Sequence, residues 1–457
     1  MQAVYIELGY GSVQITLPEQ ELERGEVRFV VVEPRLGKVA VQGNKYFDEA
    51  NIRASMPTVR EGITPNALTI ADNLRLVNEH PAKQATVVLR AAEKEGELDA
   101  TIRVADDKPW RASLTFDNTG TTQTGRYRVG AAYQNSNLFN RDHMITMQYL
   151  TSPENPNKVT ILGVGYRVPF YAQRGALDLV VGDSDVDSGT VQDLFTVSGS
   201  GTVYGARYSQ LLPKLGDIYE HKLIFGFDWR TYRNKVFTLG PGAVSLVPDI
   251  TVHPVSLTYN GVWRAPTSEL SYFLSVAQNV FPHGNDAAQI DFDTSRLGAN
   301  AAYRIYRYGV TYVKAFQNDV QMRIVFTGQK TRDSLVSGEQ FGLGGADNVR
   351  AFFEREIAND RGHRGQFEVY TPDLAPTFSW ADTRFRLLAF YDFGSVTRNN
   401  ILFGESPGQS VASAGIGLRL NRGPNLILRL DVAQVLDGGG SKERGATRGH
   451  FSFAWLF

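Results

Sequence analysis

The chain has 457 residues, enough for two or three ordinary domains or for one large closed sheet. Its 47 basic and 48 acidic residues leave a formal net charge of −1, so electrostatics gives no reason to expect nucleic acid as a partner. Cysteine is absent, as is typical of chains that cross an oxidising compartment, and no run of eighteen apolar residues predicts a membrane-spanning helix. The 44 glycines, 20 tyrosines and 26 phenylalanines favour a β protein rich in turns.

The first residues are interpreted as part of a module that begins before the chain does. No charged-then-apolar leader opens the sequence, and "AVYIEL" follows Met1 directly with the look of a strand. "SVQITLPEQ" and "EVRFVVVEP" then resemble the last two strands of a small domain. We therefore expect the chain to be a fragment whose natural N-terminus has been removed.

Residues 36–108 are predicted to form a compact two-layer α+β module of β-α-α-β-β order. Thr64 is the expected N-cap of the second helix, with Pro65 at its first position. The predicted elements are the strand "LGKVAVQGN", the helices "FDEANIRASM" and "TPNALTIADNLRLVNEH", and a hairpin of "QATVVLRAA" and "ELDATIRVAD".

From Trp110 onward the helical period disappears and about sixteen segments of roughly ten residues alternate at the period of a strand. In "HKLIFGFDWRTY" the apolar face holds Phe225, Phe227 and Trp229, while Asp228 and Arg230 lie opposite. "TRFRLLAFYDFG" and the final "HFSFAWLF" alternate in the same way.

These segments are interpreted as a transmembrane antiparallel β-barrel. They are consecutive, aromatic residues gather near their ends, and their polar faces carry several charges, which suits a wet lumen. Strands can avoid unpaired edges in lipid only by closing into a barrel. A soluble β-sandwich or a propeller is the alternative, and the aromatic terminal residue Phe457 favours the barrel.

Three stretches resemble the two-partner secretion transporters of Gram-negative outer membranes, the haemolysin or adhesin secretion/activation proteins. They are "NEHPAKQATVVL", "DDKPWRASLTFDNTGTTQTGRYR" and "NSNLFNRDHMITMQYLTSPE". The resemblance implies periplasmic POTRA modules of β-α-α-β-β order followed by a sixteen-stranded barrel. It implies a first-module remnant over 1–35, a second module over 36–108 and a barrel over 109–457. The family's plug helix and linker would then precede this sequence.

The resemblance also implies that one long loop, around residues 340–361, folds back into the lumen. The family motif ends in Val-Arg-Gly-Phe/Tyr, and here "GLGGADNVRAF" has Ala351 where the family has glycine. Alanine reaches a positive φ only at a cost, so the loop tip has either an ordinary backbone or a strained one. The matching residues are Gly344, Gly345, Val349, Arg350 and Phe352.

A second family motif, F-x-D-x-G on a barrel strand, matches Phe390, Asp392 and Gly394. Strand alternation places Asp392 on the lumen side, where a guanidinium on the loop tip would need a carboxylate. We therefore expect Arg350 to pair with Asp392. If the pairing is direct, exchanging the two charges should restore the function that either single substitution removes.

Other sites find less support. A phosphate loop at "GLGGADNVR" lacks the Lys-Ser/Thr that should follow. "GDSDVDSG" is read as a solvated loop, because the distal glutamate of an EF-hand is missing. The seven histidines form no HExxH pair, and no G-x-S-x-G elbow supports a Ser-His-Asp triad, although a triad from distant positions stays open. The sequence thus predicts no catalytic residues, no metal site and no cofactor.

The resemblance implies a protein exporter in the outer membrane, with its POTRA modules in the periplasm. The expected partners are a secreted client with an N-terminal secretion domain, outer-membrane lipid and, during biogenesis, the barrel-assembly machinery. Val87 and Leu89 either belong to the POTRA core or flank an edge that binds the client by β-augmentation. An outer-membrane insertase of the same superfamily is the leading alternative, and a passive porin or ligand-gated receptor is a third.

Overall fold

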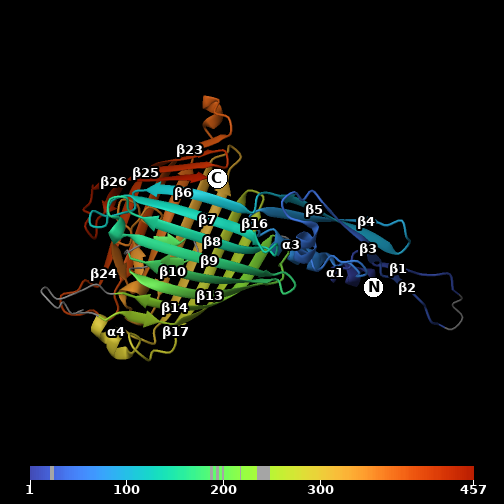
Figure 1. Cartoon of the computed structure of the whole chain (residues 1–457), viewed down its shortest axis with the longest axis horizontal. Coiled ribbons are helices and arrows are strands. Elements are labelled where there is room, and N and C mark those ends of the chain that lie inside the picture. The colour runs from blue at the N-terminus through green and yellow to red at the C-terminus, as the bar shows by residue number, and fades with distance from the viewer. Residues whose placement is uncertain (21–24, 186–188, 192–194, 198–199, 217, 234–247) are drawn as a thin grey trace. The chain divides into compact units, whose positions relative to one another are not determined.

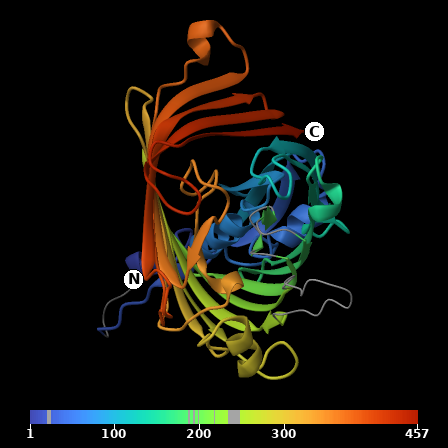
Figure 2. The same cartoon turned by 90° about the vertical axis from the view of Figure 1, so that its left-hand side faces the viewer.

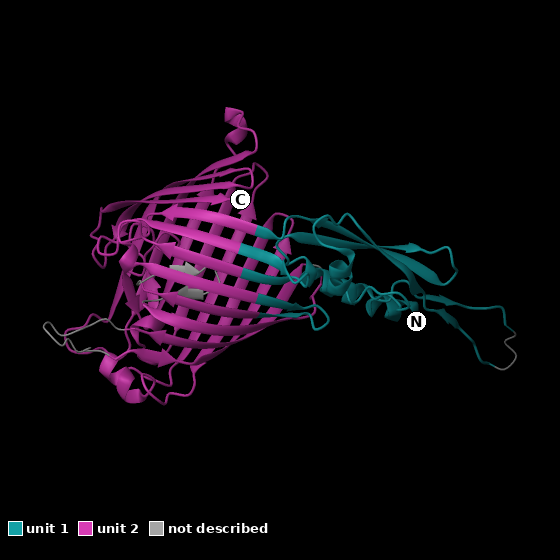
Figure 3. Cartoon of the chain, viewed as in Figure 1, with its two compact units in different colours: residues 1–110, 134–145, 167–177 teal, residues 111–133, 146–166, 178–457 magenta. Residues whose placement is uncertain are grey.

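The computed structural model describes residues 1–20, 25–185, 189–191, 195–197, 200–216, 218–233 and 248–457. The chain divides into two compact units (Figure 3). Unit 1 comprises residues 1–110, 134–145 and 167–177, and unit 2 comprises residues 111–133, 146–166 and 178–457. Among the helices of the described ranges, none has the length and apolar character needed to cross a membrane.

Unit 1 begins with the helix α1 (Gln2–Glu7) and a hairpin of β1 (Gln14–Thr16) and β2 (Val30–Val32). The expected strand at "AVYIEL" is therefore wrong: the N–H of Leu8 donates to the carbonyl of Val4 at 3.0 Å, as in a helix. A short apolar run fits either period.

The next part of unit 1 has the expected β-α-α-β-β order. In its sheet β5 lies between β3, which is parallel to it, and β4, which is antiparallel. The N-cap of the second helix is Asn66 rather than Thr64, because its side chain accepts from the N–H groups of Leu68 and Thr69. The elements are β3 (Arg35–Gln42), α2 (Glu49–Ser55), α3 (Ala67–Val77), β4 (Lys83–Ala91) and β5 (Glu97–Asp106).

Unit 1 also contains a fully buried ion pair. The Lys83 ammonium lies 2.5 Å from a carboxylate oxygen of Asp142 and 2.9 Å from the amide oxygen of Asn51. The Tyr171 hydroxyl donates to the same carboxylate. Burial lowers the pKa of Lys83, and the charge of Asp142 opposes that shift. This pair joins the sheet to two turns of unit 1 that are distant in sequence.

Sixteen long strands of the described residues form a closed antiparallel barrel (Figure 1), which confirms the predicted number. β26 pairs with β6 and closes the ring. The strands are β6 (Trp110–Asp117), β7 (Arg128–Leu138), β8 (His143–Thr151), β9 (Thr160–Phe170), β10 (Gly175–Ser184), β13 (Gly201–Leu211), β14 (Tyr219–Tyr232), β16 (Pro254–Ala265), β17 (Ser268–Asn279), β18 (Arg304–Ala315), β19 (Gln321–Lys330), β22 (Arg361–Tyr370), β23 (Thr383–Thr397), β24 (Gly408–Arg422), β25 (Leu426–Asp437) and β26 (Thr447–Leu456).

The barrel strands alternate as predicted between an apolar outer face and a polar lumen face. On β14 the side chains of Phe225 and Trp229 are about half exposed, whereas Asp228 between them is buried. Such a pattern is typical of a barrel whose outside meets lipid.

The C-terminal residue marks one end of the barrel, because the N–H of Phe457 donates to the carbonyl of Ala112. The opposite end, where the loop between β19 and β22 begins, is called the distal end here. Short elements complete the chain: η1 (Pro156–Lys158), β11 (Gly189–Val191), β12 (Phe195–Val197), β15 (Ile250–Val252), α4 (Gln289–Ser295), η2 (Ser337–Glu339), β20 (Phe341–Leu343), β21 (Ile357–Asn359) and η3 (Ala375–Phe378). Of the aspartate-rich stretch 182–189, residues 186–188 lie outside the described residues.

Candidate functional site: a loop folded into the barrel

The loop between β19 and β22 folds back into the lumen as a hairpin of β20 and β21. Figure 2 shows this segment, in orange, inside the ring of strands. It packs on the inner face of β23 to β25. The buried apolar side chains of this contact are Leu343, Val349, Ala351, Phe352 and Ile357 from the loop and Leu388, Phe390, Val396, Val411, Ala433 and Val435 from the wall.

The two motif glycines shape the turn that leads into the tip. Gly344 and Gly345 have φ values of +101° and +128°, which L side chains rarely adopt. A Cβ on Gly344 would lie 2.3 Å from the backbone carbonyl oxygen of Phe353. Glycine is therefore required here by both backbone and space.

Arg350 and Asp392 form a bidentate pair in the lumen. Nε and Nη2 of Arg350 each lie 2.7 Å from an oxygen of the Asp392 carboxylate, and the N–H of Arg350 donates to the same group at 3.1 Å. Both side chains are at most 1% exposed. Parallel N–H···O bonds of this kind hold both position and orientation.

Three further groups surround the Arg350 guanidinium. Nη1 lies 3.0 Å from Glu368 and 3.7 Å from Asp431, and the Phe390 ring centroid is 3.4 Å from Cζ. The aromatic face adds a cation–π contact. Sequence reasoning missed Glu368 and Asp431, because an inward-facing carboxylate on a barrel strand has no motif of its own.

The backbone of Ala351 is strained rather than ordinary, which decides between the two conformations expected from the sequence. Its φ is +79°, and its N–H donates to Nε2 of His450 at 3.1 Å. The left-handed region costs an L residue roughly 1–2 kcal/mol. The tip thus keeps the backbone that the family's glycine would favour.

The F-x-D-x-G motif has a physical explanation in this packing. Phe390, Asp392 and Gly394 project from the same face of β23, as residues two apart in a strand do. The Phe390 ring lies against the Arg350 guanidinium, and the Asp392 carboxylate binds it. A Cβ on Gly394 would lie 2.5 Å from Cδ2 of Leu343, so the absence of a side chain there leaves room for the hairpin.

Val87 and Leu89 belong to unit 1 and take no part in this cluster. Both lie on β4, an edge strand of its sheet. Val87 packs against the unit 1 core, whereas Leu89 is exposed.

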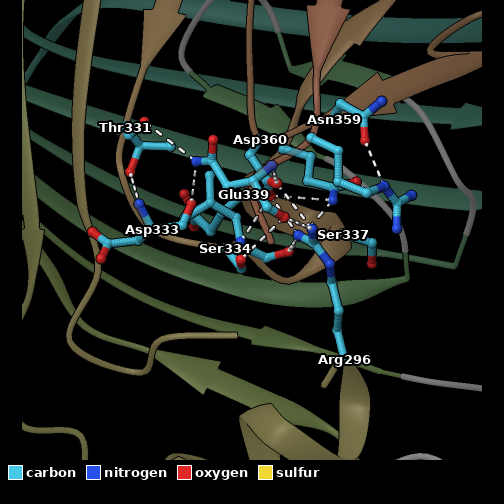
Figure 4. Close-up of polar contacts among 12 residues, drawn as sticks. Arg296, Thr331, Asp333, Ser334, Ser337, Glu339, Asn359 and Asp360 are labelled. Carbon is cyan, nitrogen blue, oxygen red and sulfur yellow. Dashed lines mark hydrogen bonds and ion pairs between the residues drawn. The ribbon is translucent and has the colours of Figure 1, made fainter. Parts of the chain in front are cut away.

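Glu339 is a buried carboxylate of the folded-in loop that sequence reasoning also missed (Figure 4). One oxygen accepts from Arg230 at 3.0 Å and from the Tyr232 hydroxyl at 2.8 Å. The other oxygen accepts from Arg307 at 3.1 Å. Glu339 therefore connects the loop to β14 and β18.

Asp360 anchors the point where the loop returns to β22 (Figure 4). Its fully buried carboxylate accepts from both Nη atoms of Arg296, and from the N–H groups of Leu335 at 2.8 Å and Asn399 at 2.7 Å. Those partners come from three different distal segments. A lone aspartate before a strand gives no signal for such a role.

The described residues hold no group of three or more His, Asp or Glu side chains placed to bind a metal ion. What the lumen does offer is a loop fixed by buried ion pairs inside a closed barrel. A wall with an apolar exterior and a charged, loop-filled interior defines the class of the protein: a transmembrane β-barrel with a plugged lumen.

Comparison with known proteins identifies the family. The model of the haemolysin secretion/activation protein ShlB/FhaC/HecB family matches residues 96–420, and the chain belongs to this family. It is an outer-membrane transporter of the two-partner secretion type.

Individual relatives of the chain are outer-membrane transporters or proteins named as transporters. The chain is 22% identical over 453 residues to the heme/hemopexin transporter protein HuxB of Haemophilus influenzae (strain 86-028NP), covering 95% of this chain and 75% of the relative. It is 22% identical over 383 residues to the outer membrane transporter CdiB of Dickeya dadantii (strain 3937), covering 78% and 62%.

Solved structures show the same fold. CdiB from Escherichia coli superposes with a TM-score of 0.79 at 17% identity, over 100% of this chain and 83% of that one. BamA from Haemophilus ducreyi lacking POTRA domains 1–3 superposes with a TM-score of 0.57 at 14% identity, over 98% and 90%.

Proposed function

We propose that this chain exports an unfolded client protein through its barrel to the cell surface. The observation that carries the proposal is the loop in the lumen, held by Arg350 between Asp392 and Glu368. A loop held by buried charges fills part of the lumen, and an exporter has to close its lumen between clients. Neither a nucleotide nor an ion gradient is required, since folding of the client outside prevents its return.

Residues 36–108 are proposed to be a POTRA module in the periplasm, preceded over 1–35 by the end of another. The β-α-α-β-β order and the sheet with two edge strands support this assignment. The edge strand β4 would pair with an extended segment of the client, its N-terminal secretion domain. Leu89, exposed on that strand, would contact the client, while Val87 stays in the module's core.

The direct test is secretion of the protein encoded beside this chain's gene, since transporter and client genes of this family are usually adjacent. Cells with the chain should release that protein into the medium, and cells without it should retain it in the periplasm. Release without the chain would contradict the proposal.

The insertase alternative is favoured only by the shared fold with BamA. It predicts a different result: depletion of this chain should lower the amounts of other barrels in the outer membrane. An exporter should leave those amounts unchanged. The same depletion experiment, read by quantitative proteomics of the outer membrane, separates the two functions.

A further inference from the structure

The folded-in loop consists of two parts that are held in different ways. The base is defined as residues 331–343 and 357–360, which continue β19 and β22. The tip is residues 344–356. Backbone in the left-handed region flanks the tip on both sides, at Gly344 and Gly345 (φ +101° and +128°) and at Arg355 (φ +50°). These positions mark where the direction of the chain changes between base and tip.

The base is part of a packed core at the distal end. Leu335 and Val336, both buried, pack against α4 and the start of β18. The remaining members of this core are Ile250, Val252, Phe292, Ala299, Ala301, Tyr303 and Ile305. β15, α4 and residues 299–305 therefore share one apolar cluster with the base.

Buried polar contacts reinforce the base on each side. Asp360 binds Arg296, as Figure 4 shows, and it also accepts from the N–H groups of Leu335 and Asn399. The side-chain amide of Gln329, at the end of β19, donates to the carbonyls of Glu339 and Asp360 at 2.9 and 3.0 Å. Both strands of the base are thus tied to the barrel wall and to each other.

The tip is held mainly by Arg350, which makes ion pairs with the wall. The N–H of Ala351 and the carbonyl of Asn348 bind His450 and Gln366. Towards the base, Glu356 accepts from the N–H and the hydroxyl of Ser441, and the Phe353 ring faces Arg448. The large buried apolar side chains of the tip are Val349 and Phe352. Once the tip leaves, Arg350 and its acidic partners meet water in the lumen, which offsets part of the loss.

We propose that Asp360 and Glu339 are positioning residues that keep the base fixed during export, so that only the tip leaves the lumen. This inference rests on the proposed export function. Releasing the base would separate two multiply bonded buried carboxylates from their arginines, and charges left unpaired in such surroundings are costly. The base then acts as a support about which the tip moves.

The different behaviour of base and tip can be tested with single introduced cysteines, because the chain has no natural cysteine. Val349→Cys reports on the tip and Leu335→Cys on the base, and both positions are fully buried in the structure. Intact cells are treated with a membrane-impermeant maleimide, with and without co-expression of the protein encoded beside this chain's gene. Heat-modifiable migration on gels shows in parallel that each barrel is folded.

The expected result is that the client speeds labelling at Val349→Cys at least about tenfold and leaves Leu335→Cys unlabelled. Labelling of both cysteines, or of Leu335→Cys alone, would overturn the fixed base. Labelling of neither while the client is secreted would overturn movement of the tip.

A second measurement does not depend on export. Asp360→Asn and Glu339→Gln keep the shape of each side chain and remove its charge. Either change should increase labelling of Leu335→Cys without any client, on the order of a hundredfold for Asp360→Asn. Unchanged labelling in folded barrels would show that these carboxylates do not hold the base. If wild-type cells secrete no client yet these variants behave as expected, the export function fails and the positioning role stands.

Discussion

Arg350 is the residue on which the folded-in tip depends, and its surroundings change the test expected from the sequence. A single partner, Asp392, was anticipated, and exchanging the two charges should then restore function. The structure adds Glu368 at 3.0 Å and Asp431 at 3.7 Å from Nη1. An aspartate at position 350 would face these two carboxylates.

We therefore expect the exchanged double variant Arg350→Asp with Asp392→Arg to export no better than either single variant. Like charges in a buried site destabilise the docked tip. Secretion of the client measures the result. Full recovery in the double variant would show that Glu368 and Asp431 contribute nothing at this position.

A substitution at Ala351 is expected to stabilise the docked tip, whereas the exchange of charges is expected to destabilise it. Ala351→Gly removes the strain of a φ of +79° and should stabilise the docked tip by about 1 kcal/mol. An opening equilibrium shifted by that amount makes tip openings about fivefold rarer. Single-channel recording of the purified barrel checks this: fewer openings are expected, and an unchanged frequency would contradict it.

Much of this site could be predicted from residue patterns, but only where a pattern existed. Alternation on β23 placed Asp392 on the lumen side, whereas the folded-in loop was implied by the resemblance to the family, through the glycine-rich motif. Asp360 and Glu339 have no motif, and their partners Arg296, Arg230 and Arg307 come from distant strands and loops. Such contacts depend on the three-dimensional path of the loop.

At the scale of elements, the hairpin of β20 and β21 fits β23 because Gly394 has no side chain. Gly394→Ala would place a methyl group 2.5 Å from Leu343, and overpacking of this kind costs about 1–3 kcal/mol. The expected result is a displaced hairpin and a larger resting conductance. Gly449→Ala on β26 is the matched control, because a Cβ there would meet only one backbone oxygen, at 4.0 Å.

Within unit 1, the buried pair of Lys83 and Asp142 makes a separate prediction. Lys83→Met leaves the Asp142 carboxylate buried without its cation, which costs about 3–5 kcal/mol. Limited proteolysis should then cleave residues 1–110 faster, while the barrel keeps its heat-modifiable migration. Lys38→Met, at an exposed position of β3, is the control and should behave as the wild type.

Element boundaries in unit 1 show the limit of reading short segments. The order β-α-α-β-β was predicted correctly, because each helix had a clear period and a polar start. "AVYIEL" was misassigned as a strand, since six residues, all but Glu7 apolar, are too few to show either period and only the hydrogen bonds of α1 decide. Asn66 displaced Thr64 as the cap because its side chain reaches two backbone N–H groups.

At the scale of the whole molecule, the closed barrel follows from sixteen alternating segments and the absence of helices to cover a sheet. The chain belongs to a family of outer-membrane transporters, and the lumen contains a loop that Arg350 and Glu339 connect to the wall by buried ion pairs. Our central claim is that this loop serves export: docking closes the lumen and release of the tip lets a client pass.

The most direct test measures secretion of the client with the wild-type chain, Arg350→Ala and Asp392→Ala, at equal amounts of folded barrel. We predict that both variants retain the client inside the cell while heat-modifiable migration and barrel abundance stay normal. Normal secretion by both variants would contradict the claim, because the folded-in loop and its buried ion pair would then have no part in export.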